Sequence, residues 1–152
     1  MKFEFKGGRE LQRKLRELDI TQGRKKAIAR RALDKAAVPI HQAWRDGVDV
    51  QSGTLKRSIK IGSRASTRGS RKFSKSTGGD LVERFVGIDP KEDPDGQVII
   101  YAFIEEFGND RQPANPAGRA AFEGRKEEAL GLIAKTLGDE IAKIARREAA
   151  KR

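Results

Sequence analysis

The sequence predicts an α+β fold: an antiparallel sheet of about four strands packed against a kinked long helix and a long C-terminal helix. Two long stretches, at about residues 22–46 and 115–149, carry apolar residues at helical spacing. Shorter apolar segments alternate with polar residues, as strands do. Turn signals rich in Gly, Pro and Asp separate these segments at regular spacing, which is typical of an antiparallel meander. The 152 residues suit one domain, 1–152.

The first predicted elements are a short strand and a short helix. Residues 2–6 (KFEFK) alternate polar and aromatic side chains, and Gly7 and Gly8 end this strand. Leu11, Leu15 and Leu18 then recur at helical spacing and predict an amphipathic helix that ends at about residue 19.

The second predicted helix is long, from about residue 22 to residue 46, with Thr21 as its N-terminal cap. Its apolar face is wide enough to be buried and consists of Ile28, Ala32, Leu33, Ala36, Ala37, Ile40, Ala43 and Trp44. Pro39 lies inside this helix and should kink it or split it in two, because proline lacks the amide hydrogen and its ring clashes with the preceding turn.

The middle of the chain contains the predicted sheet. We expect strands at about residues 55–63 and 81–88, and a strand or a strand-to-helix transition at 97–103. Between the first two lies a predicted flexible basic loop, at about residues 63–80, because Ser, Thr, Gly, Lys and Arg dominate there and Phe73 is the single aromatic residue.

The C-terminal helix is predicted from Asn115, as N-cap, and Pro116, as first helical residue, to about residue 149. Gly124, Gly131 and Gly138 recur every seven residues within it. The spacing is either coincidental or permits another backbone to approach closely. Each glycine costs about 1 kcal/mol relative to alanine in a helix interior, which favours some compensation.

Charge is unevenly distributed along the chain. The formal net charge is +11, and residues 1–80 hold 21 Lys and Arg against 8 Asp and Glu. This asymmetry predicts a polyanionic partner or an acidic face on a neighbouring protein. The candidate contact residues are basic and lie in or next to the loop: Lys56, Arg57, Lys60, Arg64, Arg68, Arg71, Lys72 and Lys75. They could be solvated, dock on an acidic neighbour, or neutralise DNA phosphates without reading sequence.

No group of residues predicts catalysis, a metal site or a cofactor. His41 is the only histidine and has no second ligand at metal spacing, so we interpret it as a packing residue. Glu105 and Glu106 are adjacent, which places them on different faces of a strand or helix and not in an acid–base pair. The chain has no cysteine and no apolar run near the length of a membrane span.

A series of motifs resembles the tail-completion and neck family of long-tailed bacteriophages, which includes proteins similar to minor tail protein Z. The motifs follow the family's order along nearly the whole chain: KFEFKGGRELQRKLREL, ALDKAAVPIHQAW, SGTLKRSI, YAFIEEFG and PANPAGRAAF. The residues that match the last two motifs include Tyr101, Ala102, Glu106, Phe107, Gly108, Pro113 and Pro116. The chain has Asn109 where the family usually has threonine.

The resemblance implies a non-enzymatic structural protein that completes the tail or joins it to the head. It implies copies arranged in a ring, a hexamer in this family, with neighbouring neck or tail proteins as partners and neither membrane nor cofactor. The protein would reside in the virion, and in the host cytoplasm during assembly. The alternative from another class is a basic DNA-binding accessory protein, which would explain the charge but not the YAFIEEFG motif.

The residues of the last two motifs also have a physical interpretation. Four apolar side chains between Tyr101 and Phe107, a glycine that permits a sharp exit, and a proline-rich segment predict a rigid elbow joining sheet to helix. The elbow either holds the fold together or, with Glu105, Glu106 and Asn109 exposed, contacts another subunit.

Overall fold

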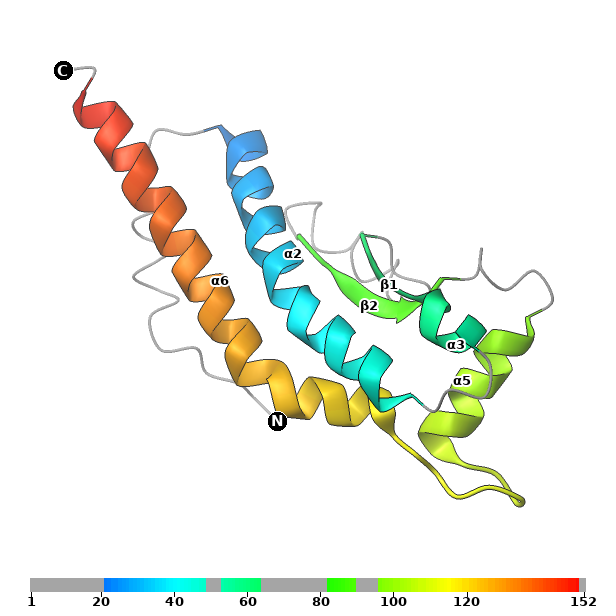
Figure 1. Ribbon diagram of the computed structural model, residues 1–152. Coiled ribbons are helices and arrows are strands. Elements are labelled where there is room, and N and C mark those ends of the chain that lie inside the picture. The colour runs from blue at the N-terminus through cyan, green and yellow to red at the C-terminus, as the bar shows by residue number, and fades with distance from the viewer. Residues whose placement is uncertain (1–20, 49–52, 64–81, 90–95, 151–152) are drawn as a thin grey trace.

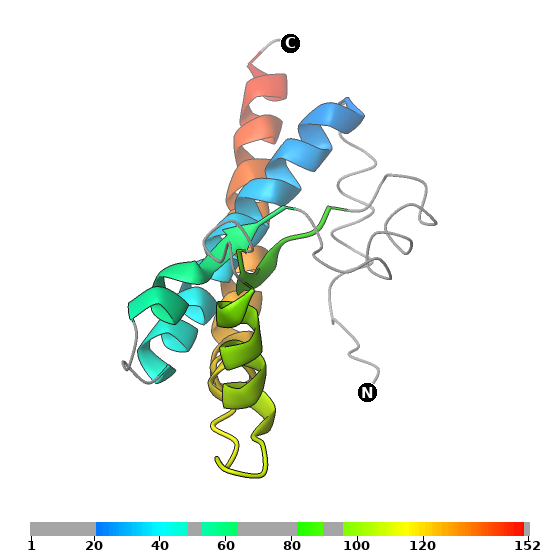
Figure 2. The same cartoon turned by 90° about the vertical axis from the view of Figure 1, so that its right-hand side faces the viewer.

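The computed structural model describes residues 21–48, 53–63, 82–89 and 96–150. Two long helices, α2 (Gln22–Gly47) and α6 (Ala117–Ala149), lie side by side along most of α2 (Figure 1). They run antiparallel, because Arg31 near the start of α2 pairs with Glu140 near the end of α6 at 3.1 Å. A small sheet and two short helices pack beside α2 and complete the described fold (Figures 1 and 2).

Helix α2 begins and ends close to the predicted positions. The Thr21 hydroxyl accepts a hydrogen bond from the Arg24 amide at 3.4 Å, which confirms the predicted cap. Pro39 lies inside one continuous helix, so of the two predicted alternatives the split is excluded and the kink stays a prediction. The reason is tertiary: packing of α2 against α6 stabilises residues on both sides of the proline and offsets the missing hydrogen bond.

The sheet of the described residues has two strands, β1 (Ile59–Gly62) and β2 (Phe85–Ile88), and not the four that were predicted. They pair antiparallel, with Ile59 opposite Ile88 and Gly62 opposite Phe85. The predicted strand at residues 2–6 and the short helix after it lie outside the described residues. The strands predicted at about residues 55–63 and 81–88 are present as β1 and β2, and each is shorter than expected.

Helix α3 (Gly53–Ser58) occupies the first half of the predicted strand at 55–63. Leu55 and Ser58 are buried, three residues apart, and the Ser58 hydroxyl donates to the Thr54 carbonyl oxygen at 2.7 Å. This side-chain-to-backbone hydrogen bond holds a helical turn up to the residue at which β1 begins.

Helix α5 (Gln97–Phe107) occupies residues 97–103, for which a strand or a strand-to-helix transition was predicted. Its sequence is nearly all apolar and lacks the alternation of a half-buried strand, which left the choice between helix and strand open. Val98 and Ala102, four residues apart, face the core. Gly96 precedes the helix with φ of 70°, a left-handed conformation that glycine adopts without strain.

Two apolar clusters lie at opposite ends of the α2–α6 pair. Near the end of α2 and the start of α6, the buried cluster joins every other described element and consists of Val48, Leu55, Ile59, Val98 and Ala117. At the other end, Ile28 of α2 packs against Ile144 of α6, with Leu137 beside them. The predicted C-terminal helix, including its end at about residue 149, is thus confirmed and anchored at both ends.

Candidate functional site

The elbow, residues 101–116, connects α5 to α6 and therefore joins helix to helix, not sheet to helix as predicted. Gly108 ends α5 with φ of 74°, and its amide donates to the Ile104 carbonyl oxygen at 2.7 Å. The Asn109 side-chain oxygen then accepts hydrogen bonds from the amides of Arg111 and Gln112, at 2.9 and 2.8 Å. These bonds form a tight turn, so the exposed Asn109 holds its own loop in shape.

Glu106 caps the start of α6 from a different helix. Its carboxylate accepts hydrogen bonds from the Gly118 amide at 2.9 Å and the Arg119 amide at 3.0 Å. Both amides are among those that a helix start leaves without intrahelical partners, and the positive end of the helix dipole favours a negative charge there. Glu106 therefore fixes the angle between α5 and α6.

This arrangement corrects two predictions for the elbow. Asn115 is not the side-chain cap of α6, because its amide nitrogen donates to the Glu105 carboxylate at 3.2 Å. Glu106 is only partly exposed and is engaged with α6, so it is not a free contact residue. Spacing along the chain could not reveal this cap, because Glu106 and Gly118 are twelve residues apart.

Replacing Glu106 by alanine should lower the free energy of unfolding by about 1–2 kcal/mol, because a capped helix start loses its acceptor. Chemical denaturation followed by circular dichroism measures the change. Glu105→Ala is the matched control, since the Glu105 carboxylate accepts a hydrogen bond from the side chain of the exposed Asn115 and not from an amide of α6. Equal losses for the two variants would contradict the capping role.

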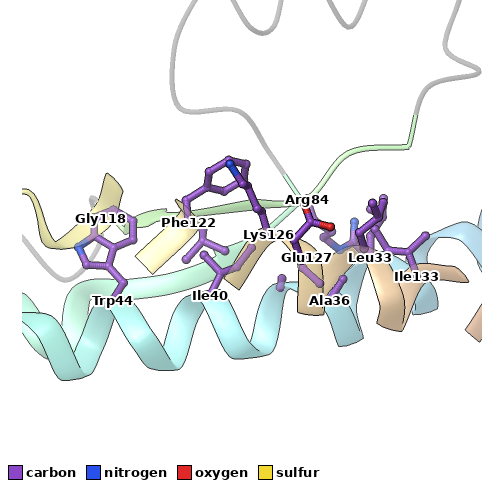
Figure 3. Close-up of a pocket in the computed structure, with 14 residues that line it drawn as sticks. Leu33, Ala36, Ile40, Trp44, Arg84, Gly118, Phe122, Lys126, Glu127 and Ile133 are labelled. Atoms are coloured by element: carbon purple, nitrogen blue, oxygen red, sulfur yellow. The ribbon is translucent and has the colours of Figure 1, made fainter. Parts of the chain in front are cut away.

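An apolar groove lies between α2 and α6 (Figure 3). Its volume is about 640 Å³. Leu33, Ile40 and Trp44 line it from α2, and Phe122, Leu130 and Ile133 line it from α6. We call this hollow the α2–α6 groove. Its lining is mostly apolar, so it suits an apolar segment of protein better than a polar substrate.

Charged residues border the α2–α6 groove. Arg84, which precedes β2, pairs with Asp34 of α2 through both carboxylate oxygens, one of them at 3.2 Å from the guanidinium. Lys126 donates to Glu123, and this hydrogen bond, together with the nearby negative charges of Glu123 and Glu127, raises the pKa of the Lys126 ammonium. Lys126 therefore stays positively charged at neutral pH.

His41 bonds the backbone of β1. Its Nε2 lies 2.9 Å from the Ile59 carbonyl oxygen, so this nitrogen donates. The side chain is partly buried and links α2 to the sheet, which agrees with the predicted packing role.

Three of the predicted basic contact residues fall in the described part of the chain. Lys56 and Arg57 lie on α3, and Lys60 lies on β1. Arg57 donates to the Thr54 hydroxyl at 3.2 Å, and Lys56 lies 3.9 Å from Asp46. Arg64, Arg68, Arg71, Lys72 and Lys75 lie outside the described residues, so the predicted basic surface stays a prediction.

The predicted glycine strip meets nothing within the described chain. A Cβ atom built at Gly124, Gly131 or Gly138 has no described atom within 4 Å. The close approach that the spacing suggested is thus not made by a described segment of the same molecule.

The described residues contain no group of three or more His, Asp and Glu side chains that could hold a metal ion. Among the helices that are described, none is both long and apolar enough to cross a membrane.

Comparison with known proteins identifies the family. Residues 9–108 match the family HK97-gp10-like, described as "Bacteriophage HK97-gp10, putative tail-component". The chain belongs to the HK97-gp10-like family. Searches among curated proteins and among solved structures found no match.

The HK97-gp10-like match confirms the predicted phage tail character but not the narrower likeness to minor tail protein Z. It covers α2, α3, the sheet and α5, and it ends at Gly108, where α5 ends. Helix α6 lies beyond the matched residues, yet it supplies one wall of the groove and carries the helix start that Glu106 caps.

Sequence reasoning missed two features of this surface. The α2–α6 groove needs two helices that are separated by 69 residues, 48–116, to lie together, which no local pattern reports. The exposed apolar face of α5 did have a signal, because residues 98–104 (VIIYAFI) are apolar at every position. Tyr101, Phe103 and Phe107, three of the apolar residues assigned to the elbow, are each more than half exposed.

Proposed function

We propose that this chain is a structural subunit of a phage virion that completes the tail or joins the tail to the head, and that its copies form a closed ring. The observation that carries this proposal is the match of residues 9–108 to a family of phage tail components. The exposed apolar residues of α5 support it, since exposed patches of this kind mark protein interaction sites.

The ring is the finer part of the proposal. Most homo-oligomers have closed symmetry, and a head-to-tail contact between different faces of one subunit closes into a ring when the rotation permits it. The neighbouring tail and neck proteins would bind the faces of that ring. The protein would thus act through contacts within the virion and not through catalysis.

Removing the gene from a phage or prophage that encodes this chain tests the function. We expect separate heads and tails that fail to join, or tails of abnormal length, when the particles are imaged by electron microscopy. Infectivity should return when the wild-type chain is supplied from a plasmid. Normal infectious particles without the protein would end the proposal.

A second candidate, a basic DNA-binding accessory protein, is favoured by one observation, the 21 basic residues against 8 acidic ones in the first 80. DNA binding that weakens steeply with salt, and that is lost when the basic residues between 56 and 75 become serine, would favour it. Such binding together with normal particle assembly in the gene deletion would select it over the structural role.

A further inference from the structure

Helix α5 exposes large apolar side chains on the face that points away from the core. Ile99, Ile100, Tyr101, Phe103 and Phe107 are each 46–63% exposed, and we call these five residues the α5 ridge. The opposite face of the helix is apolar as well, with Val98 buried in the core and Ala102 packed against it. A helix that is apolar on all sides is normally buried on all sides, so the ridge requires a partner.

The rest of this chain is poorly suited to cover the α5 ridge. Of the segments outside the described residues, only 1–20 holds several large apolar side chains; segments 64–81 and 90–95 together hold Phe73 and Leu81. Segment 1–20 joins α2 at Thr21, whereas the ridge lies at the other end of α2, where Val48 packs with Val98. The 26 residues of α2 separate the two points by about 39 Å, a distance that segment 1–20 spans only if much of it is extended.

The same chain offers a hollow that fits such a ridge. Phe122 and Leu130, which line the α2–α6 groove, are 51% and 40% exposed. Among the described residues, eight large apolar side chains are exposed, and seven of them belong to the ridge or to this groove. Most of the exposed large apolar side chains of the described residues therefore lie on α5 or line the α2–α6 groove.

The charges around these two faces are opposite. The described residues of α5 and its flanks, 85–89 and 96–118, hold four acidic side chains and one basic side chain. Helix α2, which forms one wall of the groove, holds seven basic and two acidic side chains. Two copies are thus attracted when the ridge of one approaches the groove of the other, whereas ridge against ridge brings like charges together.

We propose that the α5 ridge of one copy docks in the α2–α6 groove of the next copy. The two faces differ, so the contact is head-to-tail, and each copy keeps a free groove or a free ridge until the assembly closes. This inference rests on the proposed function and names the surfaces that would build its ring. The apolar side chains supply the attraction, and the opposite charges select the pairing.

Single cysteines test the contact directly, because the chain has none of its own. Phe103→Cys places a thiol on the ridge and Leu130→Cys places one in the groove, both at exposed positions. In an oxidised mixture of the two full-length variants, we expect the mixed disulfide dimer to form several-fold faster than either symmetric dimer. The control partner is Ala142→Cys, an exposed position on α6 away from the groove.

Three results would overturn the proposal. The first is a Phe103→Cys chain that pairs with Leu130→Cys no faster than with Ala142→Cys. The second is a faster symmetric Phe103→Cys dimer, which would mean that two ridges meet. The third is mixed dimer formation only after residues 1–20 are deleted, which would mean that the chain's own terminal segment occupies the groove.

A double variant, Phe103→Cys with Leu130→Cys, separates this proposal from the proposed ring. We expect a ladder of covalent oligomers on a denaturing gel that stops at one closed size. A ladder without an upper limit would retain the ridge–groove contact and reject the closed ring. Failure of the mixed disulfide alongside defective particles in the gene deletion would reject the contact and retain the structural function.

Discussion

Replacing Ile59 by alanine should lower the free energy of unfolding by about 2–5 kcal/mol. Ile59 is only 1% exposed and belongs to the cluster that joins α2, α3, the sheet, α5 and α6. Truncation removes buried apolar surface and leaves a cavity that the surrounding elements can only partly close. Because small domains are stable by only about 5–15 kcal/mol, the change is a large fraction of the total.

Chemical denaturation followed by far-ultraviolet circular dichroism measures this effect. Ile100→Ala is the matched control, since it makes the same substitution at a residue that is 59% exposed. At concentrations where the chain is monomeric, we expect the control to change the stability by less than about 0.5 kcal/mol. Similar losses for both variants would mean that Ile59 is not at the centre of the core.

Replacing Gly108 by alanine should destabilise the protein by about 2–4 kcal/mol, because two costs combine. The φ angle of 74° is strained for any residue with a Cβ atom. That atom would also lie 2.8 Å from the Ala114 nitrogen and 3.0 Å from the Gln112 oxygen, both of which are backbone atoms that cannot turn aside. The turn that directs α6 would have to open.

Gly131→Ala provides a control with the opposite expected sign. A Cβ atom at Gly131 meets no described atom within 4 Å, and the residue lies in the interior of α6, so alanine should stabilise the helix by about 1 kcal/mol. Thermal unfolding of both variants gives the comparison. A Gly108→Ala variant as stable as the wild-type chain would show that the elbow does not need this conformation.

The effect of Gly131→Ala on assembly carries separate information. If stability rises while particles fail to assemble, the glycine would be retained for contact with another molecule. If assembly is unchanged, the seven-residue spacing of the three glycines would be coincidental. The experiment thus decides between the two interpretations that the sequence left open.

The elbow links stability to the proposed assembly. Glu106 and Gly108 fix how α5 meets α6, and these two helices carry the α5 ridge and one wall of the α2–α6 groove. A change at the elbow would therefore alter the relative positions of both proposed contact faces. Substitutions on the ridge itself should instead affect assembly without affecting the fold, because those side chains are exposed.

The sequence by itself determined the two long helices, because their apolar periodicity and the Thr21 cap are local properties. It also determined the phage tail character, because motifs and their order along the chain can be recognised without knowing which residues are in contact. Local patterns were insufficient where the apolar run was short. At residues 98–104 every position is apolar, so only packing of Val98 and Ala102 against the core selected a helix over a strand.

Only the tertiary structure decided the roles of individual side chains. Glu106 became a helix cap because folding brings it to amides twelve and thirteen residues away, while Asn115 at the predicted cap position bonds Glu105 instead. Pro39 stays within one helix because α6 packs along α2. The groove exists because two distant helices pair, and the α5 ridge is exposed because the described core has room for only one face of that helix. These outcomes depend on which segments meet in space, and that information is not contained in the spacing of residues along the chain.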